Sequence, residues 1–363
     1  MRGAGWYRGD CHVHTVHSDG ELTPAELAAA ARAAGLDFLI VTEHNCPAPP
    51  GTWDGLDGDD LLILPGQEVT TRTGHWLALG LRPGQLVDWQ HRVGEPAFRR
   101  ALREVRAAGG LCVAAHPHAP YPGGDLMFPL ESFDAVEVWN GEWTSDRPWN
   151  ADNEAAHAEW GRRLAAGVHA GHWQPALGNS DTHLAGQLGT PQSVVFAEQL
   201  SAPAILAALR AGRSWIAESA TVEPVPRQAA FAPSRRPART LAAPVENPST
   251  SSTRASVRHA DSTHRTPLLD GQRLPDAALE LTAEADGRRA GIGEHLATAG
   301  RPVELRLRLS GVPDPRVRVH TERGKADWAA GRSTSAAETS FVRVEVRHPD
   351  GRMAALTNPI LLR

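Results

Sequence analysis

The chain has 363 residues, 41% of them hydrophobic, so it can bury a full core in one large and one small domain. Its net charge of −5 argues against a general nucleic-acid coat protein. No apolar run approaches about 20 residues, which excludes a membrane-spanning helix, and the opening MRGAGWYRGD lacks the apolar core of a signal peptide. The three cysteines match no zinc-finger spacing, so we expect reduced thiols and a cytoplasmic location.

Helices and buried strands are predicted to alternate through residues 1–221. A capping box at Thr23–Glu26 begins a helix that ends at Gly35, and the apolar run Phe38–Thr42 is the next buried strand. Further helices are expected near 96–108, 152–167 and 202–211, with strands at 111–115 and 175–179. Because no glycine-rich dinucleotide turn is present, these repeated units favour a closed or distorted α/β barrel over an open doubly wound sheet.

The composition changes after Ser219. Residues 222–275 are rich in Pro, Ser, Thr, Ala and Arg and lack periodicity, so we expect a flexible linker, although its clustered arginines leave open a basic arm for anionic partners. Apolar and polar residues then alternate over 279–283, 303–309, 317–320 and 341–346. Residues 276–363 are therefore predicted to form a small antiparallel β-sandwich domain.

Side chains of the metal-ligand type recur along the first half of the chain, mostly at or just after the end of an apolar run. The nine residues are His12, His14, Asp19, His44, Glu68, His75, His116, Asp181 and His183. In a parallel α/β barrel such positions meet at the mouth where chemistry is done. Alternate residues of a strand face the same side, so His12 and His14 project together, and Asp181 and His183 repeat that arrangement.

Imidazole and carboxylate ligands without a thiolate suit Zn, Mn or Fe, and carboxylate-rich positions also accept Mg. Three ions would need roughly nine to twelve protein ligands, which the nine residues meet if Glu68 is shared. Lys325 is the sole lysine, so a Schiff-base lysine, a P-loop lysine and a metal-bridging carbamylated lysine are excluded from the N-terminal domain. An amidohydrolase would have to use Glu68 as the bridge and would leave Asp19 and His183 without a role.

The ordered motifs HVHTVHSDG, TEHN, GQEVTT, GH, AHP and SDTH resemble those of the PHP (polymerase and histidinol phosphatase) metallohydrolases, and the closing FVRVEVRHPDGRMAALTNPILLR resembles the branch named after carbaryl hydrolases. The resemblance implies a distorted (β/α)7 TIM-like barrel and a hydrolase with two to three divalent metal ions. It also implies three ligand sets: His12, His14, Glu68 and Asp181; Glu68, His75 and His116; and Asp19, His44 and His183.

The sequence has no GxSxG elbow and no cysteine–histidine pair at a known spacing, so a metal-bound hydroxide is the expected nucleophile. Asp181 is the candidate to orient that water and His118 the candidate general acid, and Arg72 is placed to grip a phosphate or carboxylate. Candidates for a wall against an aromatic leaving group are the loop tryptophans Trp143, Trp149 and Trp173.

Three functions stay open. Several metals suit an anionic phosphate, so a phosphoesterase is predicted first. Its substrate would be a small-molecule phosphoester, a nucleotide or an oligonucleotide 5′ end, and 5′–3′ exonuclease and nucleotide phosphatase are the types considered. The carbaryl-hydrolase-like tail and the tryptophans favour a carbamate or carboxyl ester hydrolase instead. A non-catalytic metal-binding protein is the third. Neither a protein partner nor a membrane is indicated.

Overall fold

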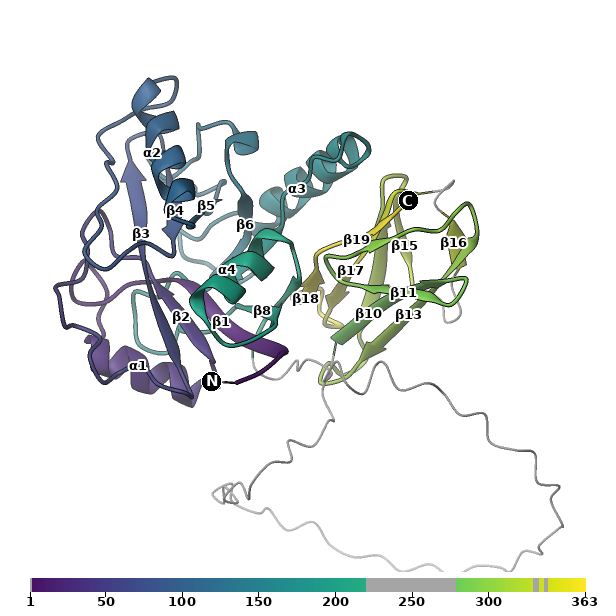
Figure 1. The fold of residues 1–363 in the computed structure, drawn as a ribbon, viewed down its shortest axis with the longest axis horizontal. Coiled ribbons are helices and arrows are strands. Elements are labelled where there is room, and N and C mark those ends of the chain that lie inside the picture. Colours follow the sequence, from purple (N-terminus) through teal and green to yellow (C-terminus); the bar gives the residue numbers. More distant parts are fainter. Residues whose placement is uncertain (1, 220–278, 329–332, 336–338) are drawn as a thin grey trace, which may run out of the picture.

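The computed structural model describes residues 2–219, 279–328, 333–335 and 339–363. The linker predicted at 222–275 lies outside the described residues. Figure 1 shows that the N-terminal half, purple to teal, carries the helices, whereas the C-terminal half, green to yellow, is built from strands. None of the helices in these ranges is long and apolar enough to cross a bilayer.

The N-terminal half alternates between helix and strand. Its helices are α1 (Pro24–Ala33), α2 (Pro96–Ala107), α3 (Asn153–Gly167) and α4 (Ala202–Arg210), with short 3-10 turns η1 (Leu130–Ser132) and η2 (Val168–Ala170). Its strands are β1 (Gly5–Val13), β2 (Phe38–Val41), β3 (Leu62–Thr71), β4 (Gly74–Leu79), β5 (Leu111–Ala114), β6 (Ala135–Asn140), β7 (Ala176–Asn179), β8 (Gln192–Ala197) and β9 (Ser214–Ala217). Every helix predicted from the sequence is present, with its ends within a few residues of the predicted ones.

The start of α1 shows how closely the local signals agree with the structure. The Thr23 side chain accepts a hydrogen bond from the backbone N–H of Glu26, and the Glu26 carboxylate accepts one from the backbone N–H of Thr23. This reciprocal pair satisfies two backbone donors that a helix start otherwise leaves unpaired. The helix then buries Leu27, Ala28 and Ala31 on one face.

The central sheet is mixed, with the strand order β9-β8-β1-β2-β3-β4-β5-β6-β7 in this half. β1, β2 and β3 are mutually parallel, as are β5, β6 and β7, but β4 is antiparallel to both of its neighbours. β1 and β7 share no continuous ladder among the described residues. They approach through one isolated bridge between Val13 and Thr182. The structure therefore confirms a mixed α/β fold but does not show a closed barrel, because this single bridge is no ladder between β1 and β7. The β3–β4 hairpin is a second departure from regular βα repeats.

The described C-terminal ranges consist of strands. They are β10 (Leu279–Ala285), β11 (Arg288–Gly291), β12 (His295–Leu296), β13 (Pro302–Leu309), β14 (Arg316–Thr321), β15 (Gly324–Asp327), β16 (Ser333–Ser335), β17 (Phe341–Arg347), β18 (Met353–Thr357) and β19 (Ile360–Leu362). The four segments predicted from alternation fall within β10, β13, β14 and β17. Strand β10 illustrates the reason, since its alternate residues are buried from Leu279 to Ala285.

The two halves of the chain share one sheet. Strand β18 pairs antiparallel with β9, with Leu356 opposite Ile216, so the central sheet continues into β17, β19 and β14. A second sheet, in the order β11-β10-β13-β16, lies across an apolar cluster that includes Leu281 and Val344 and also Trp215 from β9. The C-terminal strands are thus joined to the N-terminal half by backbone hydrogen bonds as well as by apolar packing.

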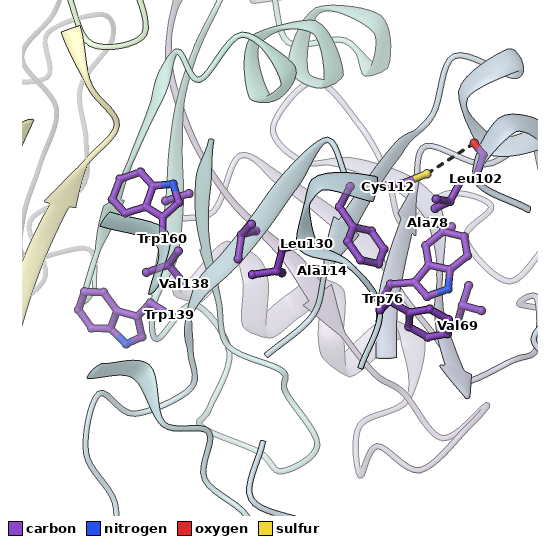
Figure 2. Close-up of a cluster of buried hydrophobic side chains, with 14 of the residues drawn as sticks. Val69, Trp76, Ala78, Leu102, Cys112, Ala114, Leu130, Val138, Trp139 and Trp160 are labelled. Carbon is purple, nitrogen blue, oxygen red and sulfur yellow. Dashed lines mark hydrogen bonds between the residues drawn. The ribbon is translucent and has the colours of Figure 1, made fainter. Parts of the chain in front are cut away.

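A second apolar cluster packs α2 and α3 against β4, β5 and β6. Figure 2 shows Trp76 beside Val69 and Ala78 at one end of this cluster, and Trp139 with Trp160 at the other. Both Trp76 and Trp139 are fully buried. Burial of such large side chains contributes roughly 1.5–3 kcal/mol each and fixes the strands that carry the polar site.

Candidate metal centre

All nine predicted residues converge at one edge of the central sheet. His14, His44, His116 and Asp181 each lie within three residues after the end of a parallel strand, and the carboxyl ends of parallel strands meet at the same edge. His75 reaches this edge differently. It lies near the start of β4, which is antiparallel to β3 and therefore places His75 opposite Thr70 near the end of β3.

The ligand atoms of these residues fall into three groups whose members lie within 4.8 Å of one another. The groups are His12, His14, Glu68 and Asp181; Glu68, His75 and His116; and His14, Asp19, His44 and His183. They match the sets implied by the resemblance, with one difference. His14 belongs to two groups, because its Nε2 lies 3.1 Å from Asp181 while its Nδ1 lies 3.9 Å from Asp19.

Glu68 lies at the centre of this arrangement and is almost completely buried. Its Oε2 is 3.2 Å from His12 Nε2 and 3.0 Å from His44 Nδ1. Its Oε1 is 2.8 Å from His75 Nδ1 and 3.1 Å from His116 Nε2. One carboxylate therefore presents its two oxygens to two different sets of imidazoles, which is the geometry of a bridging ligand.

His12 gives a direct test of whether a cation fits here. Its Nδ1 lies 3.1 Å from Glu137 Oε1, so the proton of the neutral ring is on Nδ1 and is donated to Glu137. The opposite nitrogen, Nε2, is buried without a hydrogen-bond partner and lies 3.2 Å from both Glu68 Oε2 and Asp181 Oδ1. Three acceptor atoms that face one another out of water need a proton or a cation between them. These residues fit a divalent ion.

The pKa values of the metal-free site also favour a bound cation. Burial alone would raise the pKa of the Glu68 carboxyl, but His44, His12 and His75 outweigh it and hold that pKa well below its ordinary value. Burial would lower the pKa of His44, yet Glu68 and Asp19 raise it to about 10. In the same way Asp19 and Asp181 raise the pKa of His183 to about 9 against its burial. At neutral pH an incoming cation must therefore displace protons from His44 and His183.

Two of the nine residues have strained backbones. His116 has a φ of 22° and Asp181 a φ of 50°, in the left-handed region that side chains with a Cβ rarely adopt. Both lie two residues beyond the end of a strand, where the chain turns while the side chain stays aimed at the site. Strain of this kind costs about 1–3 kcal/mol and typically persists at functional sites.

Sequence reasoning missed Glu137, which is buried beneath the centre. Besides contacting His12, its carboxylate accepts hydrogen bonds from the backbone N–H of His116 at 2.9 Å and from Asn179 Nδ2 at 2.8 Å. It also accepts one from Asn140 Nδ2, at 3.1 Å. The sequence did hold one signal for Glu137, which is the only acid in the apolar run AVEVWN. An acid in a buried strand needs polar partners. Its partners, however, come from three other segments.

The two other catalytic candidates do not join the centre. Nε2 of His118 lies 2.8 Å from Glu159 Oε2 on α3, and Arg72 is exposed in the turn between β3 and β4. Neither residue lines the cavity described below. The catalytic roles of His118 and Arg72 stay predictions, whereas Asp181 lies within the first ligand group and lines the cavity.

A cavity of about 840 Å³ opens over the metal-type residues. Its rim includes Arg147 and Trp149 from the loop between β6 and α3, and Leu184 and Gln187 from the segment after β7. Trp149 is 60% exposed.

The prediction that the other two loop tryptophans form a wall of the site is wrong. Trp143 is buried and donates to Glu154, and Trp173 packs on an apolar cluster, so neither forms the wall.

A further set of metal-type residues lies away from the centre, where α3 meets the C-terminal strands. It consists of His157, His320 and Glu345. The guanidinium of Arg343 donates to His157 Nε2 at 3.0 Å, so that lone pair is occupied and a positive charge already lies there. Burial and Arg343 together hold the pKa of His157 well below its usual value. This set is therefore a polar contact between the two halves and does not suit a cation.

No family model and no curated protein matches the chain. Similar solved structures include a two-domain protein containing a predicted PHP-like metal-dependent phosphoesterase from Bacteroides vulgatus ATCC 8482, at 15% identity and TM-score 0.48 over 99% of this chain and 96% of that chain. Others are an amidohydrolase from Chromobacterium violaceum with bound sulfate (18%, TM-score 0.34, 50% of this chain and 89% of that chain) and the lesion-specific endonuclease PfuEndoQ from Pyrococcus furiosus (16%, TM-score 0.35, 57% and 56%). At these values no family is shown, and the function must be inferred from the site itself.

Proposed function

We propose that this protein is a hydrolase, specifically a metal-dependent phosphoesterase with two to three divalent ions. One observation carries the proposal. The buried His12 Nε2 lies 3.2 Å from both Glu68 Oε2 and Asp181 Oδ1. Zn, Mn or Fe suit this ligand set best, and Mg suits its carboxylates. Such ions would supply Lewis acidity and lower the pKa of a bound water towards neutrality.

Asp181 is the residue best placed to orient an attacking water. Its Oδ2 accepts a hydrogen bond from Asn140 Nδ2 at 3.2 Å, while its Oδ1 lies 3.1 Å from His14 Nε2. Although burial would raise the pKa of Asp181, His12 and His14 hold it well below its ordinary value. A carboxylate with so low a pKa accepts a hydrogen bond from water more readily than it removes a proton, so Asp181 would orient the water.

The rim of the cavity supports an anionic substrate with an aromatic part. Arg147 offers a guanidinium, whose planar donors match phosphate oxygens. Trp149, on the same loop, offers an exposed aromatic face. A nucleotide, the 5′ end of an oligonucleotide or an aryl phosphate has both features, and the cavity volume is within the range of small-molecule sites.

A carbamate or carboxyl ester hydrolase is the second candidate, and Trp149 is the observation that favours it. An aromatic leaving group can stack on this ring without any charge, and Leu184 adds an exposed apolar side chain at the same rim. Such a substrate would make no use of Arg147. The two candidates therefore differ in which rim residue they require.

The test compares substrates across two rim variants of the metal-loaded protein. p-Nitrophenyl phosphate, bis-p-nitrophenyl phosphate and a 5′-phosphorylated dinucleotide are assayed beside 1-naphthyl acetate and 1-naphthyl methylcarbamate. We expect the phosphoesters to be preferred and Arg147→Ala to raise their KM about tenfold, because it removes a charge-assisted contact of roughly 1.5 kcal/mol. Arg99→Ala, at an exposed position on α2, is the matched control and should leave KM and kcat/KM unchanged for every substrate.

A preference for the carbamate would contradict the phosphoesterase proposal. A kcat/KM for the naphthyl carbamate at least about a hundredfold above that of every phosphoester corresponds to about 2.7 kcal/mol of transition-state binding. Combined with a larger effect of Trp149→Ala than of Arg147→Ala, that result would replace the phosphoesterase by the ester hydrolase.

A further inference from the structure

The loop that carries Arg147 and Trp149 is held by few contacts of its own. This substrate loop, residues 141–152, joins the end of β6 to the start of α3 and lines the cavity. Within it, the backbone N–H of Arg147 donates to Ser145 Oγ at 3.3 Å, and the backbone N–H of Asn150 donates to the Arg147 carbonyl at 3.1 Å. Asn150 Nδ2 donates to the carbonyls of Glu142 at 3.3 Å and Ala151 at 3.1 Å. These bonds join neighbouring residues of the loop, so the position of the loop over the cavity depends on how its two ends are anchored.

The first turn of α3 anchors the beginning of the loop and connects it to the metal centre. Asn153 Oδ1 accepts from the backbone N–H of Asn140 at 2.9 Å, and Asn153 Nδ2 donates to the carbonyls of Asn140 and Glu142 at 3.1 and 3.0 Å. Asn140 in turn donates to Asp181 at 3.2 Å. A displacement of this helical turn would move both the loop and a partner of Asp181.

The next residue on that turn, Glu154, is held by the C-terminal strands. Arg347, the last residue of β17, contacts its two carboxylate oxygens with Nη1 at 2.6 Å and Nη2 at 3.1 Å. Arg347 also donates to the Gly351 carbonyl at 2.9 Å and to Glu345 at 3.2 Å. The Arg347 side chain is 15% exposed and that of Glu154 is 53% exposed, so solvent screens the charge attraction in part, and the two-point geometry is what fixes Glu154 in position.

The same contact reaches into the substrate loop through Trp143. The indole Nε1 of Trp143 donates to Glu154 Oε1 at 2.9 Å, and the Arg347 guanidinium lies 5.4 Å from the centre of the indole ring. Arg347, Glu154 and Trp143 thus form one cluster from β17, α3 and the loop. Figure 1 shows α3 extending from the helical half towards the C-terminal strands.

We propose that the C-terminal strands set the conformation of the substrate loop, with Arg347 as a positioning residue that acts through Glu154 and Trp143. Arg347 does not line the cavity and would not touch substrate. Its role is to hold the loop so that Arg147 and Trp149 stay at the rim. Only the kinetic part of the test below rests on the proposed phosphoesterase function.

The main experiment is hydrogen–deuterium exchange of the full chain, read from peptides that cover the substrate loop. In Arg347→Ala we expect these amides to exchange at least about threefold faster than in the wild type, because the loop end is released. Arg347→Lys should give a smaller increase, since it keeps the charge but loses the two-point contact. Peptides from β1 and β3 should be unchanged.

Arg352→Ala is the matched control. Arg352 belongs to the same C-terminal hairpin and also contacts the N-terminal half, through Glu218 at 2.8 Å. Its other side-chain partner is Asp350, so its contacts lie away from the loop and from α3. Its removal should leave exchange in the loop at the wild-type rate. Unchanged loop exchange in Arg347→Ala, or an equal rise throughout the chain in both variants, would overturn the proposal.

A kinetic measurement adds a second readout. With p-nitrophenyl phosphate, Arg347→Ala should raise KM about fivefold at unchanged metal content, as expected when a positioning contact outside the site is lost. If the wild type hydrolyses no phosphoester, the proposed function fails while the exchange experiment still decides the role of Arg347. A fall in metal content in Arg347→Ala would instead mean that the C-terminal strands support the centre itself and would contradict the proposal.

Discussion

Replacing Glu68 with glutamine is expected to lower kcat/KM by at least about 10³-fold, because the change removes the charge that two groups of ligands share. Glutamine keeps the size of the side chain, but its amide nitrogen presents hydrogens where a carboxylate oxygen now faces His75 at 2.8 Å or His44 at 3.0 Å. Two cations beside a neutral amide would lack a compensating charge. The measurement is kcat/KM on the best phosphoester together with metal content.

Two control variants belong with Glu68→Gln. Glu131→Gln removes an exposed carboxylate in η1, and Lys325→Ala removes the sole lysine at an exposed position on β15. Both should retain wild-type turnover. A Glu68→Gln protein that keeps its activity and its full metal content would exclude a shared carboxylate and with it the multinuclear arrangement.

Glu137→Gln should weaken metal binding about 10–100-fold, the effect typical of residues that orient a metal-binding histidine. Glutamine can still accept a hydrogen bond from His12 Nδ1, but it no longer carries the charge that makes the lone pair of the opposite nitrogen, Nε2, a better ligand for a cation. Activity should therefore fall at low metal concentration and recover when excess metal is added. Calorimetric titration of the metal-free protein with Zn or Mn measures the affinity directly.

Glu104→Gln on α2, an exposed glutamate, serves as the control for this titration. Thermal unfolding of the metal-free proteins is needed as well, since the Glu137 carboxylate also accepts hydrogen bonds from His116 and Asn179. A loss of affinity that excess metal cannot rescue, accompanied by a large fall in thermal stability, would show that Glu137 supports the fold and does not tune His12.

The convergence of the nine residues could be predicted because it depends on local rules. The positions of His14, His44, His116 and Asp181 follow from the ends of parallel strands, and these rules need no knowledge of distant contacts. The helix that begins after Thr23 was equally predictable from its capping box. Such features are specified by residues only a few positions apart.

The features that were missed or mispredicted depend on partners far away in the chain. Trp143 lies in a polar stretch, yet it is buried against Trp139 in an apolar cluster, with Glu154 and Arg347 of β17 also in contact with it. The pairing of β18 with β9 likewise joins segments separated by residues 218–352. No local pattern encodes such a register, since alternation shows which face of a strand is buried but not what buries it.

The central claim is that the nine residues bind two to three divalent ions, and elemental analysis tests it most directly. The protein is stripped with a chelator, reloaded separately with Zn and Mn, dialysed and analysed for metal per chain, with Asp181→Asn treated in parallel. We predict two to three ions in the wild type and at least one fewer in Asp181→Asn. Less than one ion per chain in the reloaded wild type would contradict the account.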